Sequence, residues 1–255
     1  DLITRMNEKR IGADVYPMYK HFRGWASPDV TIEQMETGDP YPIKGAWIQT
    51  ANVIGGQAAR AKFHYDAMKK LDFVAVVDLF HNPTTMALAD IILPAATFPE
   101  KNSFRSWWSP MDSIKKRVQV GECRSDWEIN FELAKRFNPE GLQRWATVIA
   151  YFDERMEPSG MTFEDLEAKG GWAMSPEGPG RPYHRHEKGH LRADGKPGFN
   201  TPSGKVELYN KSFESWDMDP LPFYTEPPQS EASTPELFKK YPLVMITGAR
   251  SNLFF

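Results

Sequence analysis

Short apolar runs alternate with helical patterns in the first half of the chain. Residues 46–50 (AWIQT) form one such run, which ends before Asn52 and the pair Gly55-Gly56. A helical pattern then continues as far as Lys70. Asparagine and glycine are typical of the turns between regular elements. The pattern therefore predicts a strand, a loop and a helix.

The same order repeats downstream. Residues 73–77 (FVAVV) form a continuous apolar run, closed by Asp78, of the kind found in strands buried on both faces of a parallel sheet. Residues 84–89 fit a short helix. Residues 91–93 (IIL) predict a third strand, which Pro94 ends because proline cannot donate to the ladder. Strands that alternate with helices predict an α/β fold, in which a parallel sheet is flanked by helices.

Three further elements are predicted beyond this core. Residues 117–120 (RVQV) fit a strand, and residues 126–137 fit a helix with Ser125 or Asp126 as its N-cap. Residues 205–209 (KVELY) fit a short alternating strand.

The chain divides by composition into four parts. Residues 1–44 contain four prolines and no sustained period, which indicates a connecting segment. The α/β domain follows and is expected to end near residue 150, and residues 166–240 are expected to form an irregular Pro/Gly-rich extension with long loops. Residues 241–255 begin with a strand-like run that has no partner strand. The sequence begins with neither an initiator Met nor a signal-peptide pattern. We therefore expect an internal fragment of a longer protein.

Charge and cysteine content exclude several classes of function. The net charge is −3, so the chain lacks the basic field that draws proteins to nucleic acid. Cys123 is the single cysteine, which excludes an intramolecular disulfide and a C-x-x-C metal site. No apolar run reaches the roughly 20 residues of a membrane span.

Polar residues follow two of the predicted strands. Ligands of parallel α/β sheets bind beyond the carboxyl ends of the strands, where Asn52 and Asp78 would lie. Asn52 could contact a nucleotide, or it could simply form the turn. Asp78 could accept from ribose hydroxyls or from guanine, or it could cap the turn or helix that follows. The spacing leaves these alternatives open.

Four segments, in order, resemble motifs of the molybdopterin oxidoreductases of the dimethyl sulfoxide reductase family. Residues 88–101 (LADIILPAATFPEK) resemble the family's A-D-[VI]-[VI]-L-P-A-[AT] … E-K signature. The other three are residues 124–127 (RSDW), similar to S-D-x-W, residues 199–209 (FNTPSGKVELY), similar to T-P-S-G-K-[IV]-E, and residues 243–250 (LVMITGAR), similar to the strand-T-G-R opening of the C-terminal domain. The resemblance covers residues 45–255. It implies the family's third, Rossmann-like domain over residues 45–165 and the first strand of its C-terminal dinucleotide-binding barrel within residues 241–255.

The resemblance also implies a cofactor and its binding residues. Family members bind molybdenum or tungsten through two molybdopterin guanine dinucleotides, and the metal ligand and the usual iron–sulfur cluster belong to N-terminal parts that this sequence lacks. No catalytic or metal-binding residue is therefore assigned here, and the fragment alone is expected to be inactive. The cofactor-contacting positions matched by the resemblance are Asn52, Val77, Asp78, Lys101, Asp126, Thr247, Gly248 and Arg250. The remaining domains of the same chain and an iron–sulfur electron-transfer subunit are the candidate partners.

Two positions depart from the family pattern. Val53 follows Asn52 where the family often has proline, and Asn102-Ser103 follow Lys101 without the family's glycine. The second change removes a residue that adopts positive φ without strain, so we expect the loop after Lys101 to take another path. Taken without the resemblance, Lys101 is a candidate phosphate-binding cation or an ordinary exposed lysine.

Two further candidates fall outside these motifs. His184, His186 and His190 lie in one loop, and the His-x-His spacing suits zinc, although a glycine-rich loop facing solvent or a partner is the favoured interpretation. Cys123 is interpreted as structural, because no histidine adjoins it in sequence.

The leading functional hypothesis is the cofactor-binding part of an enzyme that transfers electrons or an oxygen atom at molybdenum or tungsten. A non-redox family member, such as a hydratase or a transhydroxylase or dehydroxylase, is the alternative within the family. A stand-alone nucleotide-binding module is the alternative outside it.

Overall fold

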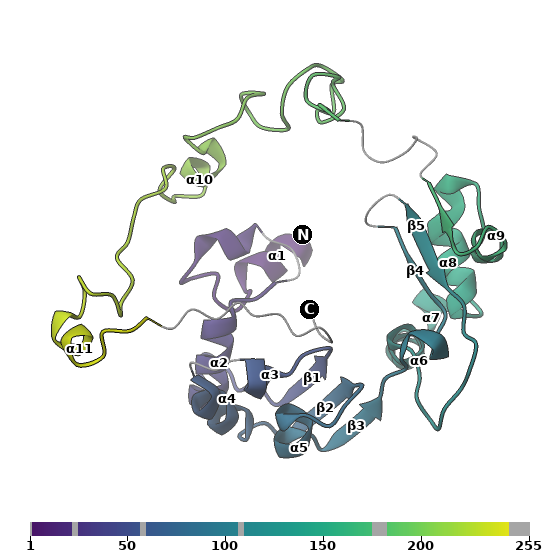
Figure 1. Cartoon of the computed structure of the whole chain (residues 1–255), viewed down its shortest axis with the longest axis horizontal. Coiled ribbons are helices and arrows are strands. Elements are labelled where there is room, and N and C mark those ends of the chain that lie inside the picture. The colour runs from purple at the N-terminus through teal and green to yellow at the C-terminus, as the bar shows by residue number, and fades with distance from the viewer. Residues whose placement is uncertain (1, 22–24, 57–59, 107–109, 175–182, 245–255) are drawn as a thin grey trace. The chain divides into compact units, whose positions relative to one another are not determined.

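The three predicted strands form one parallel sheet in the order β1-β2-β3 (Figure 1). They are β1 (Gly45–Gln49), β2 (Phe73–Asp78) and β3 (Ile91–Pro94). Trp47 lies beside Ala75, which lies beside Ile91, and four successive residues of β2, Val74 to Val77, are buried. The predicted α/β fold with a parallel sheet is confirmed.

The computed structural model describes residues 2–21, 25–56, 60–106, 110–174 and 183–244. The chain separates into two compact units, Asp1–Lys205 and Val206–Phe255, which are described individually. The first unit contains the sheet and continues past the predicted domain end at residue 165.

Helices cover one face of the parallel sheet. They are α2 (Pro28–Thr37), α4 (Ala61–Met68) and α5 (Pro83–Leu88), and the core beneath them consists of Ile32, Ile48, Ala67, Met68, Val74, Val76 and Leu88. Right-handed crossovers that step in one direction along a sheet place their helices on the same face, which accounts for this arrangement. Trp47, Phe73 and Ile91 alternate with the core residues and are 39%, 45% and 48% exposed.

Helix α2 lies within the segment that was expected only to connect. Pro28 occupies the first turn, where its missing N–H is harmless, and Ser27 precedes it as the N-cap residue. Gly38 ends the helix in the left-handed conformation with φ of 74°. The prolines of residues 1–44 therefore mark a helix boundary as well as loops, and Ile32 joins the core.

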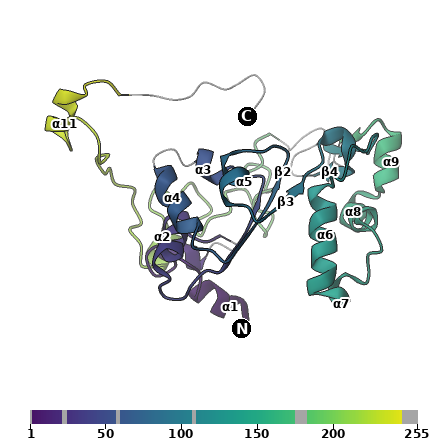
Figure 2. The same cartoon turned by 90° about the horizontal axis from the view of Figure 1, so that it is seen from below.

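A second, antiparallel sheet is built in the order β4-β5-β6. The strands are β4 (Ser103–Arg105), β5 (Met111–Ile114) and β6 (Trp172–Ala173). Helices α6 (Asp126–Phe137), α8 (Val148–Met156) and α9 (Phe163–Ala168) are grouped with β4 and β5 (Figures 1 and 2). The core here consists of Met111, Phe152, Met156, Phe163 and Leu166.

The predicted bounds of α6 are confirmed, and Ser125 is its N-cap residue. The Ser125 hydroxyl accepts from the Glu128 backbone N–H, and the Glu128 carboxylate accepts from the Ser125 backbone N–H at 2.8 Å. This reciprocal capping box satisfies donors at the helix start that have no intrahelical partner.

Shorter elements complete the described residues. They are α1 (Leu2–Glu8), α3 (Val53–Gly56), α7 (Pro139–Leu142), α10 (Lys211–Ser215), α11 (Pro235–Lys240) and the 3₁₀ helices η1 (Pro17–Lys20), η3 (Phe98–Glu100) and η4 (Glu157–Ser159). None of the helices in these parts of the chain is both long and apolar enough to cross a bilayer.

Two predicted strands are wrong. Residues 117–120 form no strand, because the backbone N–H groups of Arg117 and Val118 both donate to the single carbonyl of Pro99. Residues 205–209 are also irregular, and their apolar side chains Val206 and Leu208 are 67% and 83% exposed. In both segments apolar and polar residues alternate, but the apolar side chains have no apolar surface to pack against. Of the strand-like run 241–247, residues 241–244 are irregular and the rest lies outside the described residues.

Candidate functional site

Asn52 and Asp78 lie at the same edge of the parallel sheet. Gln49, the last residue of β1, is in register with Val77, so Asp78 at the end of β2 and Asn52 just after β1 both lie at the carboxyl edge. This is the edge at which parallel α/β sheets bind ligands. Their predicted juxtaposition is confirmed.

The Asn52 side chain caps α3. Its Oδ1 accepts from the Gly55 backbone N–H at 3.0 Å and from the Thr84 hydroxyl at 2.9 Å. A Cβ atom at Gly55 would come 2.4 Å from the Asn52 amide, so glycine is needed for this close approach. Thr84 is fully buried and also accepts from the Ile54 N–H at 2.9 Å. Asn52 therefore performs the turn-forming role, and the residue is exposed at the carboxyl edge of the sheet.

The Asp78 carboxylate organises the loop between β2 and α5. One oxygen accepts from the backbone N–H groups of Leu79 at 2.7 Å and Phe80 at 3.2 Å. The other accepts from the side-chain amide of Asn82 at 2.7 Å, and Asn82 caps α5 through Thr84 and Thr85. A carboxylate has about four lone-pair sites, so these three bonds leave capacity for a ligand donor.

Val77 differs from the other predicted positions because its side chain is only 1% exposed. Its carbonyl accepts from the Thr50 backbone N–H at 3.3 Å. Thr50 has φ of +58°, a left-handed conformation that is strained for a β-branched residue. Any contact between Val77 and a ligand would therefore involve the backbone, beside a strained turn.

Lys101 and Asp126 are brought together, although they are 25 positions apart in the sequence. The Lys101 Nζ lies 3.7 Å from the Asp126 carboxylate, at the first residue of α6. Both side chains are partly exposed, at 26% and 31%. The other Asp126 oxygen accepts from the Gln49 amide at 2.7 Å, and Gln49 Oε1 accepts from the Trp47 indole at 3.0 Å. This group joins the end of β1 to the start of α6.

Sequence reasoning missed Gln49 and Thr50. The signal for Gln49 was present, since it is the polar residue of an otherwise apolar strand. The left-handed conformation of Thr50 has no such signal, because threonine is seldom found there. The predicted residues Thr247, Gly248 and Arg250 lie outside the described residues.

The departure after Lys101 leads into a strand. Lys101 is extended, with φ of −136° and ψ of 152°, and the chain continues into β4. Asn102 Oδ1 accepts from the Lys116 backbone N–H at 2.9 Å. Asn102 thus ties the chain after Lys101 to the segment that returns from β5.

Glu100 and Cys123 form a buried pair beside this turn. The Glu100 carboxylate accepts from the Thr97 hydroxyl at 2.6 Å, from the Thr97 N–H at 3.0 Å and from the Cys123 thiol at 3.1 Å. The bonds from Thr97 lower the pKa of Glu100 to about 2, with a smaller contribution from Cys123. The bond to Glu100 raises the pKa of the Cys123 thiol. A thiol held protonated is a poor nucleophile, in keeping with a structural Cys123.

Glu100→Gln should make the stability of the chain less sensitive to acid. The Glu100 pKa is lowered from the ordinary 4.5 to about 2, so ionised Glu100 stabilises the fold above pH 4.5 and loses this contribution as the pH falls toward 2. The variant should be less stable at neutral pH, and its melting temperature should fall less between pH 4.5 and 2 than that of the wild type. Glu122→Gln, at an exposed neighbouring position, is the control. Parallel profiles for wild type and Glu100→Gln would contradict this assignment.

Comparison with known proteins gives consistent matches. The family model for molybdopterin oxidoreductases matches residues 24–136. Acetylene hydratase of Syntrophotalea acetylenica is 32% identical over 234 residues, covering 90% of this chain and 30% of that protein. Dopamine dehydroxylase of Eggerthella lenta is 28% identical, covering 98% and 31%, and dimethyl sulfoxide reductase of Escherichia coli is 27% identical, covering 81% and 28%.

A solved structure agrees with these sequence matches. Acetylene hydratase from Pelobacter acetylenicus superimposes with a TM-score of 0.80 at 29% identity, covering 98% of this chain and 36% of that one. The chain therefore spans about a third of the length of the relatives that it matches.

Proposed function

This chain belongs to the molybdopterin oxidoreductase family, and we propose that the carboxyl edge of its parallel sheet holds the guanosine end of a molybdopterin guanine dinucleotide. The observation that carries the proposal is the convergence of Asn52, Asp78, Lys101 and Asp126 on the ends of β1 and β2 and the start of α6. When bound, the cofactor would supply a molybdenum or tungsten centre for the transfer of electrons or an oxygen atom.

The donors and acceptors at this edge suit a guanine nucleotide. Guanine presents N–H donors, and ribose presents hydroxyls, which a carboxylate accepts through charge-assisted hydrogen bonds. Asp78 is partly exposed and has acceptor capacity beyond its three internal bonds. Those bonds fix the carboxylate at the strand end, so little side-chain entropy remains to be lost on binding.

Lys101 supplies the complementary charge for a phosphate. Its 3.7 Å contact with Asp126 is longer than a hydrogen bond, so the ammonium group keeps donors for a ligand. Asp126 and its bond from Gln49 keep the cation near the end of β1. This arrangement supports Lys101 as the phosphate-binding cation, rather than as an ordinary exposed lysine.

Lys101→Ala should reduce the cofactor content of a full-length family enzyme that carries this region. Loss of one charged contact at a partly exposed position corresponds to about 1–2 kcal/mol, or roughly 5- to 30-fold in affinity. Lys101→Arg should retain most of the binding, and Lys69→Ala, at an exposed lysine after α4, is the matched control. The melting temperature should change little because partly exposed ion pairs contribute little to stability. Cofactor content unaltered by Lys101→Ala would remove Lys101 from the site.

A hydratase or dehydroxylase reaction is the second candidate. Among the relatives, acetylene hydratase matches 90% of this chain and dopamine dehydroxylase matches 98%. We propose on this basis two alternatives for the activity of the whole enzyme. One is hydration, in which water is added with no net electron transfer, and the other is dehydroxylation, in which replacing C–OH by C–H consumes two electrons from a donor and releases water. An iron–sulfur cluster and an electron-transfer subunit belong to the redox proposal. Turnover that requires an artificial electron donor or acceptor would favour a redox reaction, dehydroxylation included, whereas hydration without net electron flow would favour a hydratase.

A further inference from the structure

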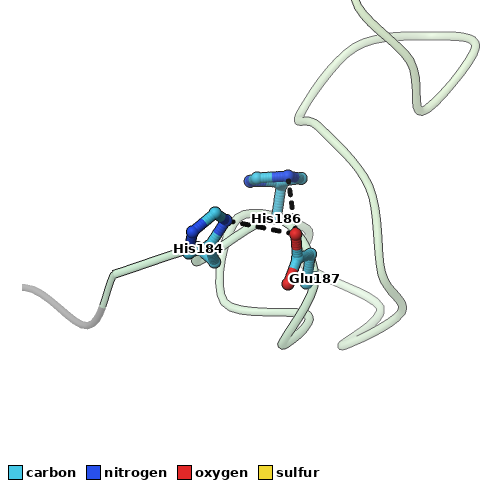
Figure 3. A group of neighbouring side chains, drawn as sticks. All are labelled: His184, His186 and Glu187. Atoms are coloured by element: carbon cyan, nitrogen blue, oxygen red, sulfur yellow. Dashed lines mark ion pairs between the residues drawn. The ribbon is translucent and has the colours of Figure 1, made fainter.

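His184, His186 and Glu187 form a cluster of potential metal ligands in the loop that follows β6. The imidazole nitrogens and the carboxylate oxygen all lie within 4.8 Å of one another (Figure 3). The sequence favoured a loop facing solvent or a partner, since spacing alone did not specify how the side chains were directed. The structure directs three different side chains toward one point.

The spacing of the ligand atoms suits a small divalent cation. Glu187 Oε1 lies 3.1 Å from Nδ1 of His184 and 3.7 Å from Nε2 of His186. Ligands about 2.1 Å from a tetrahedral zinc ion are separated from each other by about 3.4 Å. These two distances lie on either side of this value, and all three ligand atoms lie within 4.8 Å of one another, so small side-chain rotations would complete the geometry.

The backbone of the loop holds these side chains in place. His184 has φ of +54°, and its carbonyl accepts from the Glu187 N–H at 3.0 Å, which closes a turn between the two ligands. The His186 ring stacks on Phe199 with centroids 4.9 Å apart, and the His186 carbonyl accepts from the Gly198 N–H at 2.7 Å. Positive φ outside glycine is uncommon, and its presence in a ligand-bearing turn is a reason to look for function.

The cluster is also accessible from solvent. The side chains of His184, His186 and Glu187 are 49%, 38% and 63% exposed. Two imidazoles and one carboxylate form a donor set that zinc uses when its fourth position is occupied by water or another exogenous ligand.

We propose that His184 Nδ1, His186 Nε2 and the Glu187 carboxylate bind one Zn²⁺ ion, with the fourth position open to water. This zinc site is distinct from the proposed cofactor site at the carboxyl edge of the parallel sheet, because the two sites share no residue. Metal would cross-link the side chains of the turn at residues 184–187 and connect the turn, through the stacked His186, to the segment at Phe199.

Zinc titration of the 255-residue chain, stripped with EDTA and desalted, tests this proposal. Competition with a chromophoric chelator should give one Zn²⁺ per chain. His184→Ala and His186→Ala should each weaken binding by about 100-fold or more, because loss of an outer-shell partner alone typically costs 10- to 100-fold. Glu187→Gln, which keeps the size but removes the charge, should also weaken binding.

His190→Ala is the matched control, since His190 is exposed in the same loop but is not one of the three clustered ligands. Its affinity should equal that of the wild type, and all variants should have the same melting temperature in EDTA. Absence of saturable binding, binding unaffected by the ligand variants, or an equal loss in His190→Ala would each overturn the proposal.

Discussion

Asp78→Ala should lower both the stability of this chain and the cofactor content of a full-length family enzyme that contains it. The variant removes the acceptor for Leu79, Phe80 and Asn82. Loss of a turn and of support for a helix cap corresponds to about 1–2 kcal/mol of unfolding free energy. Loss of a charged hydrogen bond to the nucleotide would add about 1.5–3 kcal/mol of binding free energy, or roughly 10- to 150-fold in affinity.

Asp78→Asn separates the two roles. Asparagine also forms turns of this kind, so its side-chain oxygen can still accept from Leu79 and Phe80. The amide carries no charge and replaces one acceptor by a donor, so its pairing with guanine or ribose should be impaired. We expect a smaller loss of stability than in Asp78→Ala, with a comparable loss of cofactor. Urea unfolding and metal analysis of the purified enzyme measure the two effects. Reduced stability with full cofactor content in both variants would leave Asp78 with a structural role alone.

Phe152→Ala should destabilise the antiparallel part of the first unit by about 3–5 kcal/mol, the usual cost of truncating a buried phenylalanine. Phe152 is 0% exposed, and its ring packs against Phe104 and Trp127, each with centroids 5.5 Å away, and against Phe163 at 5.8 Å. The truncation leaves a cavity among rings that come from β4, α6 and α9. Urea unfolding followed by tryptophan fluorescence should detect it through Trp127.

Two variants calibrate this prediction. Phe152→Leu retains much of the buried volume and should cost less than Phe152→Ala. Phe137→Ala, at an 82% exposed position at the end of α6, should change the stability by less than about 0.5 kcal/mol. A loss below about 1 kcal/mol in Phe152→Ala would show that the core collapses around the missing ring.

The sequence predicted the parallel sheet well because its signals are local. The β-branched run of β2 is buried on both sides as its composition indicates, and Ser125 with Glu128 identifies the start of α6. The helix α2 was hidden because prolines usually argue against helices, although Pro28 lies in the one turn that tolerates it. The false strand at residues 205–209 shows the opposite error, since alternation predicts a strand only where there is a surface to cover.

The candidate site was predictable in part. Asn52 and Asp78 follow strands, so the topology alone places them at one edge. The contact between Lys101 and Asp126 was not predictable from spacing, because it depends on how α6 begins relative to the turn after η3. The bonds within the Asp78 loop also depend on side-chain geometry that no motif specifies.

The hydrogen bond between Gln49 and Asp126 connects two parts of the candidate site that rest on different hydrophobic cores. Asn52 and Asp78 depend on the core beneath α2 and α4, whereas Asp126 begins a helix whose partner α8 belongs to the core around Phe152. Cooperative units of this size can open separately, each with its own free energy. Transient opening of the core around Phe152 would therefore displace Asp126 and break its ion pair with Lys101, while Asn52 and Asp78 keep their native positions at the strand ends. A ligand that contacts both Asp78 and Lys101 would couple the opening of one core to the opening of the other.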